Sequence, residues 1–111
     1  MITGSSFALE DVLISGNTGP VVIDSNCDMR LTVVENTMNV AITNNNLVQA
    51  AEAGATCFAN GFTDADVSKN KDVTIEGNTG EGLYCSGNDP APKEGPRGNL
   101  ITFSDGQCAG F

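Results

Sequence analysis

Side chains that carry oxygen alternate along one stretch of the chain, a pattern from which calcium loops are built. In "DADVSKNKD", every second residue supplies an oxygen: Asp64, Asp66, Ser68, Asn70 and Asp72. A complete calcium loop also has Gly at its sixth position and Glu at its twelfth, and this stretch has neither. Alternation within a strand would instead place Asp64, Asp66 and Asp72 on a solvated face. The sequence therefore predicts no bound metal and no cofactor, with this acidic stretch as the one calcium candidate.

Acid–base catalysis has few candidates in this chain. The absence of His excludes catalytic triads and proton shuttles that depend on imidazole. Polysaccharide-active enzymes use paired carboxylates, often beside basic groups or Ca²⁺. The basic residues are few: Arg30, Arg97, Lys69, Lys71 and Lys93. The sequence predicts that the protein is not an enzyme.

Composition and charge limit the partners. The chain has 111 residues and a formal net charge of −9, and we expect one domain over residues 1–111. This charge argues against nucleic acid and anionic membrane surfaces as partners. No apolar run is long enough for membrane insertion, and the start lacks a signal-like segment. The acidic residues near expected turns, such as Asp24, Asp28, Glu35 and Glu76, are interpreted as aids to solubility.

Four Cys in a chain without His predict two disulfides and an oxidising compartment. Zinc would require closely spaced ligands, and no Cys pair has such a spacing. A Cys85–Cys108 bridge would pin the last part of the chain to its neighbour and close residues 85–111. Cys27–Cys57 follows by elimination.

A short pattern, apolar–x–apolar–x–x–Asn, repeats along the chain. It first appears as Val12, Ile14 and Asn17, and it includes the copy Ala55, Cys57 and Asn60. A looser copy, Ile101–Phe103–Gly106, closes the chain. The Asn residues of the eight copies are Asn17, Asn26, Asn36, Asn45, Asn60, Asn70, Asn78 and Asn88. Internal repetition of this kind indicates a repeat architecture.

Each copy predicts a short strand followed by a turn. The two apolar positions share the strand period, and the Gly, Asn, Asp and Ser residues that follow favour turns. Most alternate Asn residues are 18 or 19 positions apart, which suits one turn of a coil. An insertion around residues 47–54 lengthens that spacing by five or six residues. Within it, Leu47–Ala53 is interpreted as a helical turn or bulging loop. Pro90, Pro92 and Pro96 mark a turn-rich loop rather than a strand.

These features predict an all-β fold, a small parallel β-solenoid of four to five coils of 18–20 residues. Stacked coils would place equivalent Asn residues about 4.8 Å apart, the spacing of neighbouring strands. Each side-chain amide could then bond to the next Asn or to the backbone. The eight Asn residues are therefore predicted to form a structural ladder rather than a catalytic group.

The closing segment adds a resemblance. The stretches "GLYCSGNDPAP" and "GQCAG", together with "VLISGNTGPVVIDSN" and "VTIEGNTGEG", resemble uncharacterised secreted proteins of actinobacteria. The resemblance covers residues 12–46 and 67–110. It implies an exported, right-handed parallel β-helix-like domain, and it implies no activity.

The sequence thus predicts a structural or interaction module, secreted or at the cell surface. Partners would be the protein itself, in a filament or oligomer, or extracellular surface components. The first alternative is a binding module for glycan or calcium. A row of exposed aromatic residues would favour a glycan, and Tyr84 alone is a poor candidate. The second is a degenerate polysaccharide-active β-helix.

Overall fold

The structure is a computed structural model that describes the backbone of residues 1–111 and all side chains except those of Ala8 and Leu9. It contains ten strands and one helix. In chain order these are β1 (Ile2–Thr3), β2 (Ser6–Ser15), β3 (Val21–Asp24), β4 (Cys27–Val34), β5 (Val40–Thr43), α1 (Leu47–Glu52), β6 (Phe62–Ser68), β7 (Val73–Glu76), β8 (Thr79–Ser86), β9 (Lys93–Glu94) and β10 (Leu100–Gly106).

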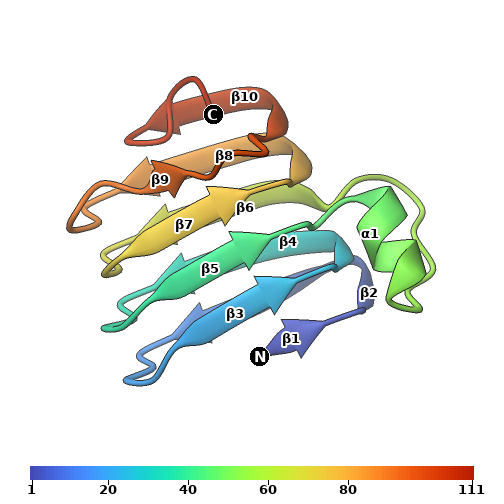
Figure 1. Ribbon diagram of the computed structural model, residues 1–111, viewed down its shortest axis with the longest axis horizontal. Helices are drawn as coiled ribbons and strands as arrows, with labels where there is room; N and C mark the ends of the chain where they lie inside the picture. Colours follow the sequence, from blue (N-terminus) through green and yellow to red (C-terminus); the bar gives the residue numbers. More distant parts are fainter.

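The strands form two parallel sheets that are wound as one coil. Sheet A has the order β1-β3-β5-β7-β9, and sheet B has the order β2-β4-β6-β8-β10. Each coil contributes one strand to each sheet, which gives five coils, and the predicted all-β parallel solenoid is confirmed (Figure 1). The strands of sheet A point from left to right at the front of the view. The chain returns behind them through sheet B and rises from the N terminus to the C terminus. The coil is therefore right-handed.

The core consists of rows of apolar residues that stack from coil to coil between the sheets. In sheet A, Val21 pairs with Val40 and Ile23 with Ile42, and the rows continue into β7. The facing rows of sheet B contain Leu31, Val33, Ala65, Val67, Leu83 and Cys85. These residues lie at the predicted inward positions and are buried. Stacked β-branched side chains suit a pleated surface, which explains why a core with so few aromatic rings is sufficient.

The insertion in the third coil is longer than predicted. Asn45 bonds to Asn78 across 33 residues, whereas Asn26 bonds to Asn45 across 19. The extra length is therefore about 14 residues rather than five or six. It includes α1 and the segment that follows, so the copy Ala55–Cys57–Asn60 lies in a loop and not in a strand.

The last coil also differs from the prediction in two places. A two-residue strand, β9, lies within the proline-rich segment that was expected to be only a loop. In β10, Phe103 pairs with Gly82 and Ser104 with Leu83. Since Leu83 points inward, Ser104 takes the inward position and Phe103 faces outward, which reverses the prediction for Phe103.

Candidate functional site

Two ladders of side-chain amides run along the corners of the solenoid, and their inner members are buried. The ladder that follows sheet A contains Asn26, Asn45, Asn78 and Asn99, and the ladder that follows sheet B contains Asn17, Asn36, Asn70 and Asn88. At each step the backbone N–H and side-chain Nδ2 of one Asn donate to Oδ1 of the Asn in the next coil. For Asn45 and Asn78 these distances are 3.0 and 2.8 Å.

The second hydrogen of each Nδ2 donates toward the preceding coil. Asn78 Nδ2 donates to the Ile42 carbonyl of the preceding coil at 2.8 Å, and Asn45 donates to Ile23 in the same way. A fully stacked Asn therefore uses both amide hydrogens and both acceptor positions of its oxygen. Only a primary amide of this length provides the donors and acceptors that the corner requires.

The residue before each ladder position has a left-handed backbone. The φ angles at Gly77 and Asn44 are 68° and 55°, and these residues precede Asn78 and Asn45. The same conformation occurs before the other ladder residues, at Gly16, Ser25, Glu35, Lys69, Gly87 and Gly98. Gly and Asn adopt it most readily, which explains why Gly–Asn and Asn–Asn pairs mark so many corners.

The sequence-predicted ladder residues lie in these two rows, with one exception. Asn60 is in the insertion, where its backbone carbonyl accepts from the Asp28 N–H, and it belongs to neither ladder. Conversely, the pattern missed Asn99, because no pair of apolar residues precedes it at the required offset. The Gly98–Asn99 pair was the signal that could have identified it.

The C-terminal end of each ladder is capped within the chain. Gln107 replaces Asn in the fifth coil, where its Oε1 accepts from Asn88 and its Nε2 turns back to the Asn88 carbonyl at 3.0 Å. At the other corner, Asn99 Nδ2 donates to the Glu94 carboxylate at 3.1 Å. Near this end, Cys108 is buried and bonded to Cys85. These groups occupy the donors that a sixth coil would have used.

The N-terminal end is open by contrast. We use this name for the uncovered side of β1 and β2 together with the corner of residues 16–20. Asn17 Oδ1 accepts no hydrogen bond from any described residue, although its N–H and Nδ2 both donate to Asn36. Phe7, Val12 and Ile14 pack against the core but are only partly buried. The corresponding residues one coil further in, Leu31 and Val33, are fully covered.

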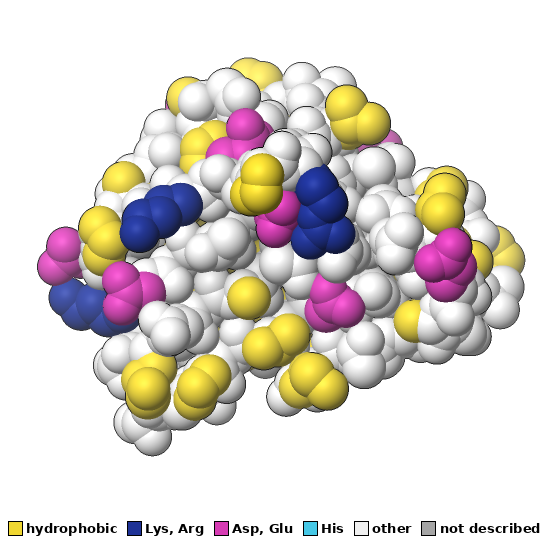
Figure 2. Space-filling model, viewed as in Figure 1, with side chains coloured by type: hydrophobic (Ala, Val, Ile, Leu, Met, Phe, Trp, Pro, Cys, Tyr) yellow, Lys and Arg dark blue, Asp and Glu magenta, His cyan; other side chains and the backbone are white. Residues whose placement is uncertain are grey.

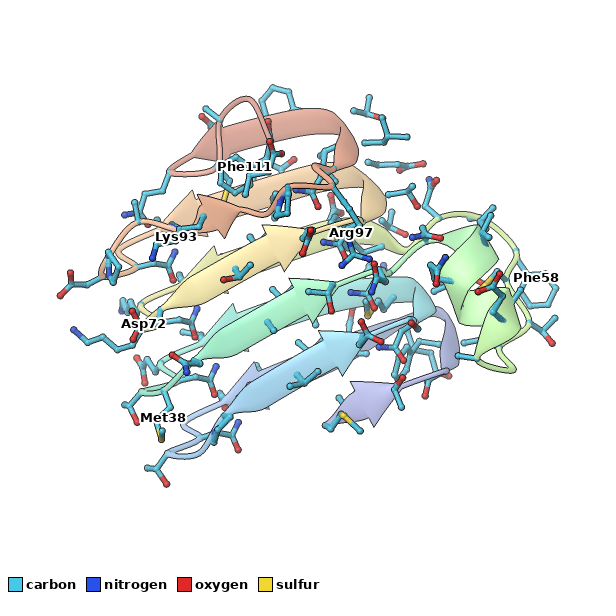
Figure 3. The ribbon with its side chains drawn as sticks, in the orientation of Figure 1. Met38, Phe58, Asp72, Lys93, Arg97 and Phe111 are labelled. Atoms are coloured by element: carbon cyan, nitrogen blue, oxygen red, sulfur yellow. A yellow bond between two sulfur atoms is a disulfide. The ribbon has the colours of Figure 1, made fainter. Side chains whose placement is uncertain are left out.

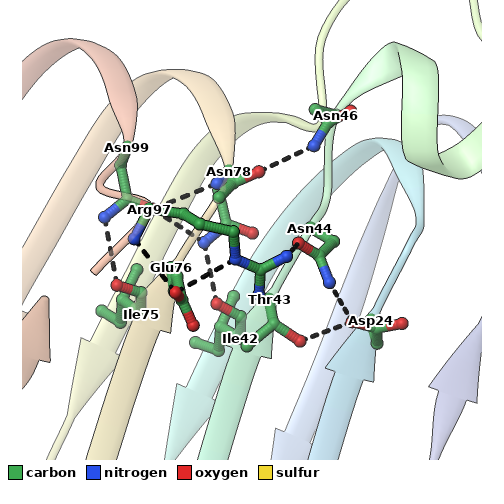
Figure 4. A network of polar contacts seen from close by, with 11 residues as sticks. Asp24, Ile42, Thr43, Asn44, Asn46, Ile75, Glu76, Asn78, Arg97 and Asn99 are labelled. Carbon is green, nitrogen blue, oxygen red and sulfur yellow. Dashed lines mark hydrogen bonds and ion pairs between the residues drawn. The ribbon is translucent and has the colours of Figure 1, made fainter. Parts of the chain in front are cut away.

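A chain of polar contacts crosses four coils beside the ladder that follows sheet A, and we call it the corner network (Figure 4). Arg97 Nε and its backbone N–H both lie 3.0 Å from Glu76 Oε1, and its guanidinium also donates to Asn44 Oδ1. Asn44 Nδ2 donates in turn to Asp24 Oδ1 at 3.0 Å, and the Thr43 hydroxyl donates to the same atom.

The contacts within the corner network shift the pKa values of its charged side chains. The hydrogen bond from Arg97 lowers the pKa of Glu76, and Glu76 in turn raises the pKa of Arg97. Burial raises the pKa of Asp24, but hydrogen bonds from Thr43, Ser25 and Asn44 outweigh it, so the pKa is lowered overall. These carboxylates are held ionised and paired, which suits a structural strap and not a general acid. The interpretation of Asp24 and Glu76 as aids to solubility was therefore incomplete.

Asp28 anchors the long insertion and was also misjudged from the sequence. Its carboxylate is buried and accepts from the backbone N–H groups of Phe58 and Ala59 at 2.7 and 2.8 Å. The adjacent Cys27 is bonded to Cys57, so both predicted disulfide pairings are present. At its other end the insertion begins with Asn46, which caps α1 and donates to the Gly77 carbonyl. Phe58 itself projects away from the solenoid (Figure 3).

The acidic calcium candidates do not converge. Asp64 and Asp66 are exposed on the outer face of β6, whereas Asp72 lies in the turn that leads into β7. Figure 3 shows Asp72 at the edge of the molecule. Among the side chains that the structure describes, no group of three acidic or Cys residues is arranged to hold a metal ion.

An open hollow of about 500 Å³ lies between α1 and the last coil. Its walls include Leu47, Val48 and Leu100, and its floor is the tight corner Gly77–Thr79. Arg97 reaches its rim but is already paired with Glu76. Figure 2 shows the basic side chain at the centre of this face lying next to an acidic one. The hollow therefore offers apolar contact without a free charge.

An aromatic pair on the outer face of sheet B was not predicted. Tyr84 and Phe103 lie on neighbouring strands with ring centroids 5.9 Å apart and planes tilted by 46°. Both are exposed. The pair was missed because Phe103 was assigned to the core, which left Tyr84 without an aromatic neighbour.

Comparison with protein-family models, with curated proteins and with solved structures gives no match. The β-solenoid and its buried amide ladders therefore rest on the structure alone, and the resemblance to secreted actinobacterial proteins stays a prediction. Two disulfides are typical of an oxidising compartment. In the part of the chain that the structure describes, no helix has the length and apolar character needed to cross a bilayer.

Proposed function

We propose that this protein is a non-enzymatic, exported interaction module that associates end to end through its N-terminal end. Its partner there is a second copy of the chain. The observation that carries the proposal is the difference between the two ends. Gln107, Glu94 and the Cys85–Cys108 disulfide close the C-terminal end. At the N-terminal end the Ser5 N–H donates to Asn26 Oδ1 at the corner after sheet A, but no described group donates to Asn17 Oδ1 at the corner after sheet B.

The N-terminal end has unused hydrogen-bonding capacity. The Gly16 N–H donates to the Val34 carbonyl at 3.2 Å. Because alternate residues of a parallel strand bond to opposite neighbours, Leu13 and Ser15 direct their backbone groups toward the uncovered side of β2. Unpaired edges of this kind are templates for pairing with another chain.

Apolar burial would favour the same contact. A covering strand would complete the burial of Phe7, Val12 and Ile14, which pack on the core from one side only. The second part of β2 and the corner beyond it carry no charge, since no charged residue occurs from Val12 to Ile23, and Asp11 in the first part is paired with Arg30. A chain with a net charge of −9 can therefore bring two such edges together with limited repulsion.

The capped C-terminal end determines the form of the assembly. A filament needs the C-terminal end of one copy to bind the N-terminal end of the next, and the terminal ladder amides of Asn99 and Gln107 already donate within their own chain. Two N-terminal ends related by a two-fold axis can instead pair antiparallel, which gives a closed dimer.

Export is the second part of the proposal. Two buried cross-links persist in secreted and cell-surface proteins, where no reducing system opens them. A rigid coil without a paired catalytic group would then act by contact alone.

Sedimentation velocity between about 5 and 500 μM tests the dimer, because mass action increases its fraction with concentration. We expect a single monomer–dimer equilibrium. Leu13→Lys places a charge on the open edge and should abolish the dimer, as edge lysines do in natural sheets. Thr32→Lys is the matched control, since Thr32 occupies the same outer row one coil further in.

Three outcomes would overturn the proposal. They are a monomer at every concentration, an open series of oligomers, and equal loss of dimer in both lysine variants.

A further inference from the structure

The aromatic pair lies within an acidic part of the outer face of sheet B, far along the coil from the N-terminal end. Tyr84 pairs in register with Asp66 on one side and with Asp105 on the other. The three side chains therefore form a row across three strands, spaced by the roughly 4.8 Å between strands. Phe103 occupies the neighbouring row beside Gly82 and Asp64. The position of Tyr84 thus lies between two acidic residues, and its ring reaches over Gly82 beside Asp64, with a second ring on the neighbouring strand.

The carboxylates of this row have no cationic partner. The ion pairs among the described side chains are Asp11–Arg30, Asp89–Lys71 and Glu76–Arg97. None of them includes Asp64, Asp66 or Asp105, all of which are exposed. Asp105 accepts a hydrogen bond from the Gly106 N–H, which leaves its other oxygen available.

Gly82 shapes the surface beneath the pair. A Cβ atom at this position would lie 2.7 Å from Asp64 Oδ1 and 3.0 Å from the Tyr84 hydroxyl oxygen. The Asp64 carboxylate and the Tyr84 ring therefore converge over the glycine. Any larger residue would separate them, so the sequence at this point favours a compact group of one ring and one carboxylate.

We propose that Tyr84, Phe103, Asp66 and Asp105 bind an arginine side chain from a basic segment of a partner protein. A guanidinium stacks on an aromatic face and pairs with carboxylates through its planar fork. The two rows supply two rings and the carboxylates of Asp64, Asp66 and Asp105, none of which forms an ion pair. The negative charge of the whole protein attracts a basic segment.

The tilt of the rings argues for a side chain rather than a sugar. Planes that differ by 46° do not form one platform on which consecutive sugar rings could lie. They form two differently inclined faces, each of which can accept a single flat group. A glycan is therefore the competing ligand that the experiment must distinguish.

Tyr84 provides a direct readout, because it is the only Tyr in a chain without Trp. We would titrate end-blocked hexa-arginine into the protein at low salt and follow tyrosine emission. We expect a saturable change in emission, with weaker binding of hexalysine, whose ammonium groups cannot stack as a plane.

Two double variants make the test specific. Asp66→Asn with Asp105→Asn should weaken hexa-arginine binding about tenfold, the effect expected for loss of two exposed charge pairs. Glu52→Gln with Asp72→Asn removes the same charge from exposed positions elsewhere and should change the affinity less than about twofold. Both substitutions replace exposed groups, and circular dichroism would verify the fold.

Three results would overturn the proposal. Hexa-arginine could cause no saturable change in tyrosine emission. Both double variants could lose affinity equally, which would indicate general charge attraction. Oligomers of glucosamine could bind while hexa-arginine does not, which would identify a glycan site. None of these results depends on the oligomeric state of the protein.

Discussion

The side-chain Nδ2 of Asn45 donates to Oδ1 of Asn78 at 2.8 Å, although 33 residues separate them. The next contact in the same direction, from Asn78 to Asn99, spans 21 residues and has nearly the same length. The insertion leaves the coil after Asn45 and returns before β6, so the ladder continues as if the extra residues were absent. The corner geometry, rather than the spacing in sequence, is what the fold preserves.

Replacement of Asn78 should be among the most destabilising changes in this protein. Asn78→Ala would leave two Asn45 donors and the Ile42 carbonyl buried without partners. Each such group costs about 1–3 kcal/mol, so we expect a loss of about 3–5 kcal/mol in the free energy of unfolding. Urea denaturation followed by circular dichroism measures it.

Asn78→Asp tests whether the direction of the amide matters. The carboxylate can still accept from Asn45, but its second oxygen would face the Ile42 carbonyl oxygen in place of a donor. We expect a loss at least as large as that of Asn78→Ala. Asn17→Ala, at the open end of the other ladder, should cost less than about 1 kcal/mol because water can replace its contacts. Equal effects at Asn17 and Asn78 would contradict the ladder as a source of stability.

Much of the fold could be predicted from the sequence because the repeat indicates where the strands and the corners lie. Val or Ile at alternate positions predicts the inward rows, and Asn after a left-handed residue predicts the corner. Asn60 shows the limit of this reasoning. A short pattern with two apolar positions cannot distinguish a strand from a loop whose conformation depends on distant groups. Here those groups are Asp28 and the Cys27–Cys57 bond. The disulfide pairing could be predicted by elimination, but the loop conformation that it stabilises could not.

The aromatic pair was missed for a different physical reason. Side chains in a strand alternate, so a shift of one residue exchanges the inner and outer faces. The copy Ile101–Phe103–Gly106 appeared to continue the pattern, but in β10 it is Ser104 that aligns with the inward Leu83. The register of the last strand depends on its pairing with β8, and sequence spacing alone does not provide it.

Gly80 should tolerate no side chain. A Cβ atom there would lie 2.2 Å from the ring of Phe62, which is fully buried in the core. We expect Gly80→Ala to lower the free energy of unfolding by about 2 kcal/mol, as overpacking of a close-packed core does. Gly19→Ala is the control, because nothing lies within 4 Å of its added Cβ. A thermal unfolding midpoint for Gly80→Ala as high as that for Gly19→Ala would show that the ring can move aside.

Asp28 should determine the local stability of the insertion. Asp28→Asn keeps one acceptor oxygen but turns an amide toward a backbone N–H group, and Asn accepts the left-handed backbone at this position. We expect the free energy of local opening near Phe58 to fall by about 1–3 kcal/mol. Hydrogen exchange measured for the Phe58 and Ala59 amides would detect this. Asp64→Asn, on the exposed face of β6, should leave these rates unchanged. Unaltered exchange in Asp28→Asn would assign the anchoring to the disulfide alone.

The corner network should make stability depend on pH in the acid range. The pKa of Glu76 is lowered from 4.5 by Arg97, so the folded protein binds fewer protons than the unfolded chain in this range. Its stabilising effect is therefore complete above about pH 4.5 and is lost as the pH falls through the lowered pKa. Asp24, whose pKa is lowered from 3.8, acts in the same direction at lower pH.

Glu76→Gln should thus have a lower midpoint of thermal unfolding than the wild type near neutral pH and a smaller decrease on acidification. The two midpoints should converge once the pH is below the lowered pKa of Glu76, where neither the glutamate nor the glutamine side chain is charged. Glu52→Gln, in the exposed helix α1, should follow the wild-type profile. A Glu76→Gln profile parallel to that of the wild type would show that the pair with Arg97 adds nothing to the folded state.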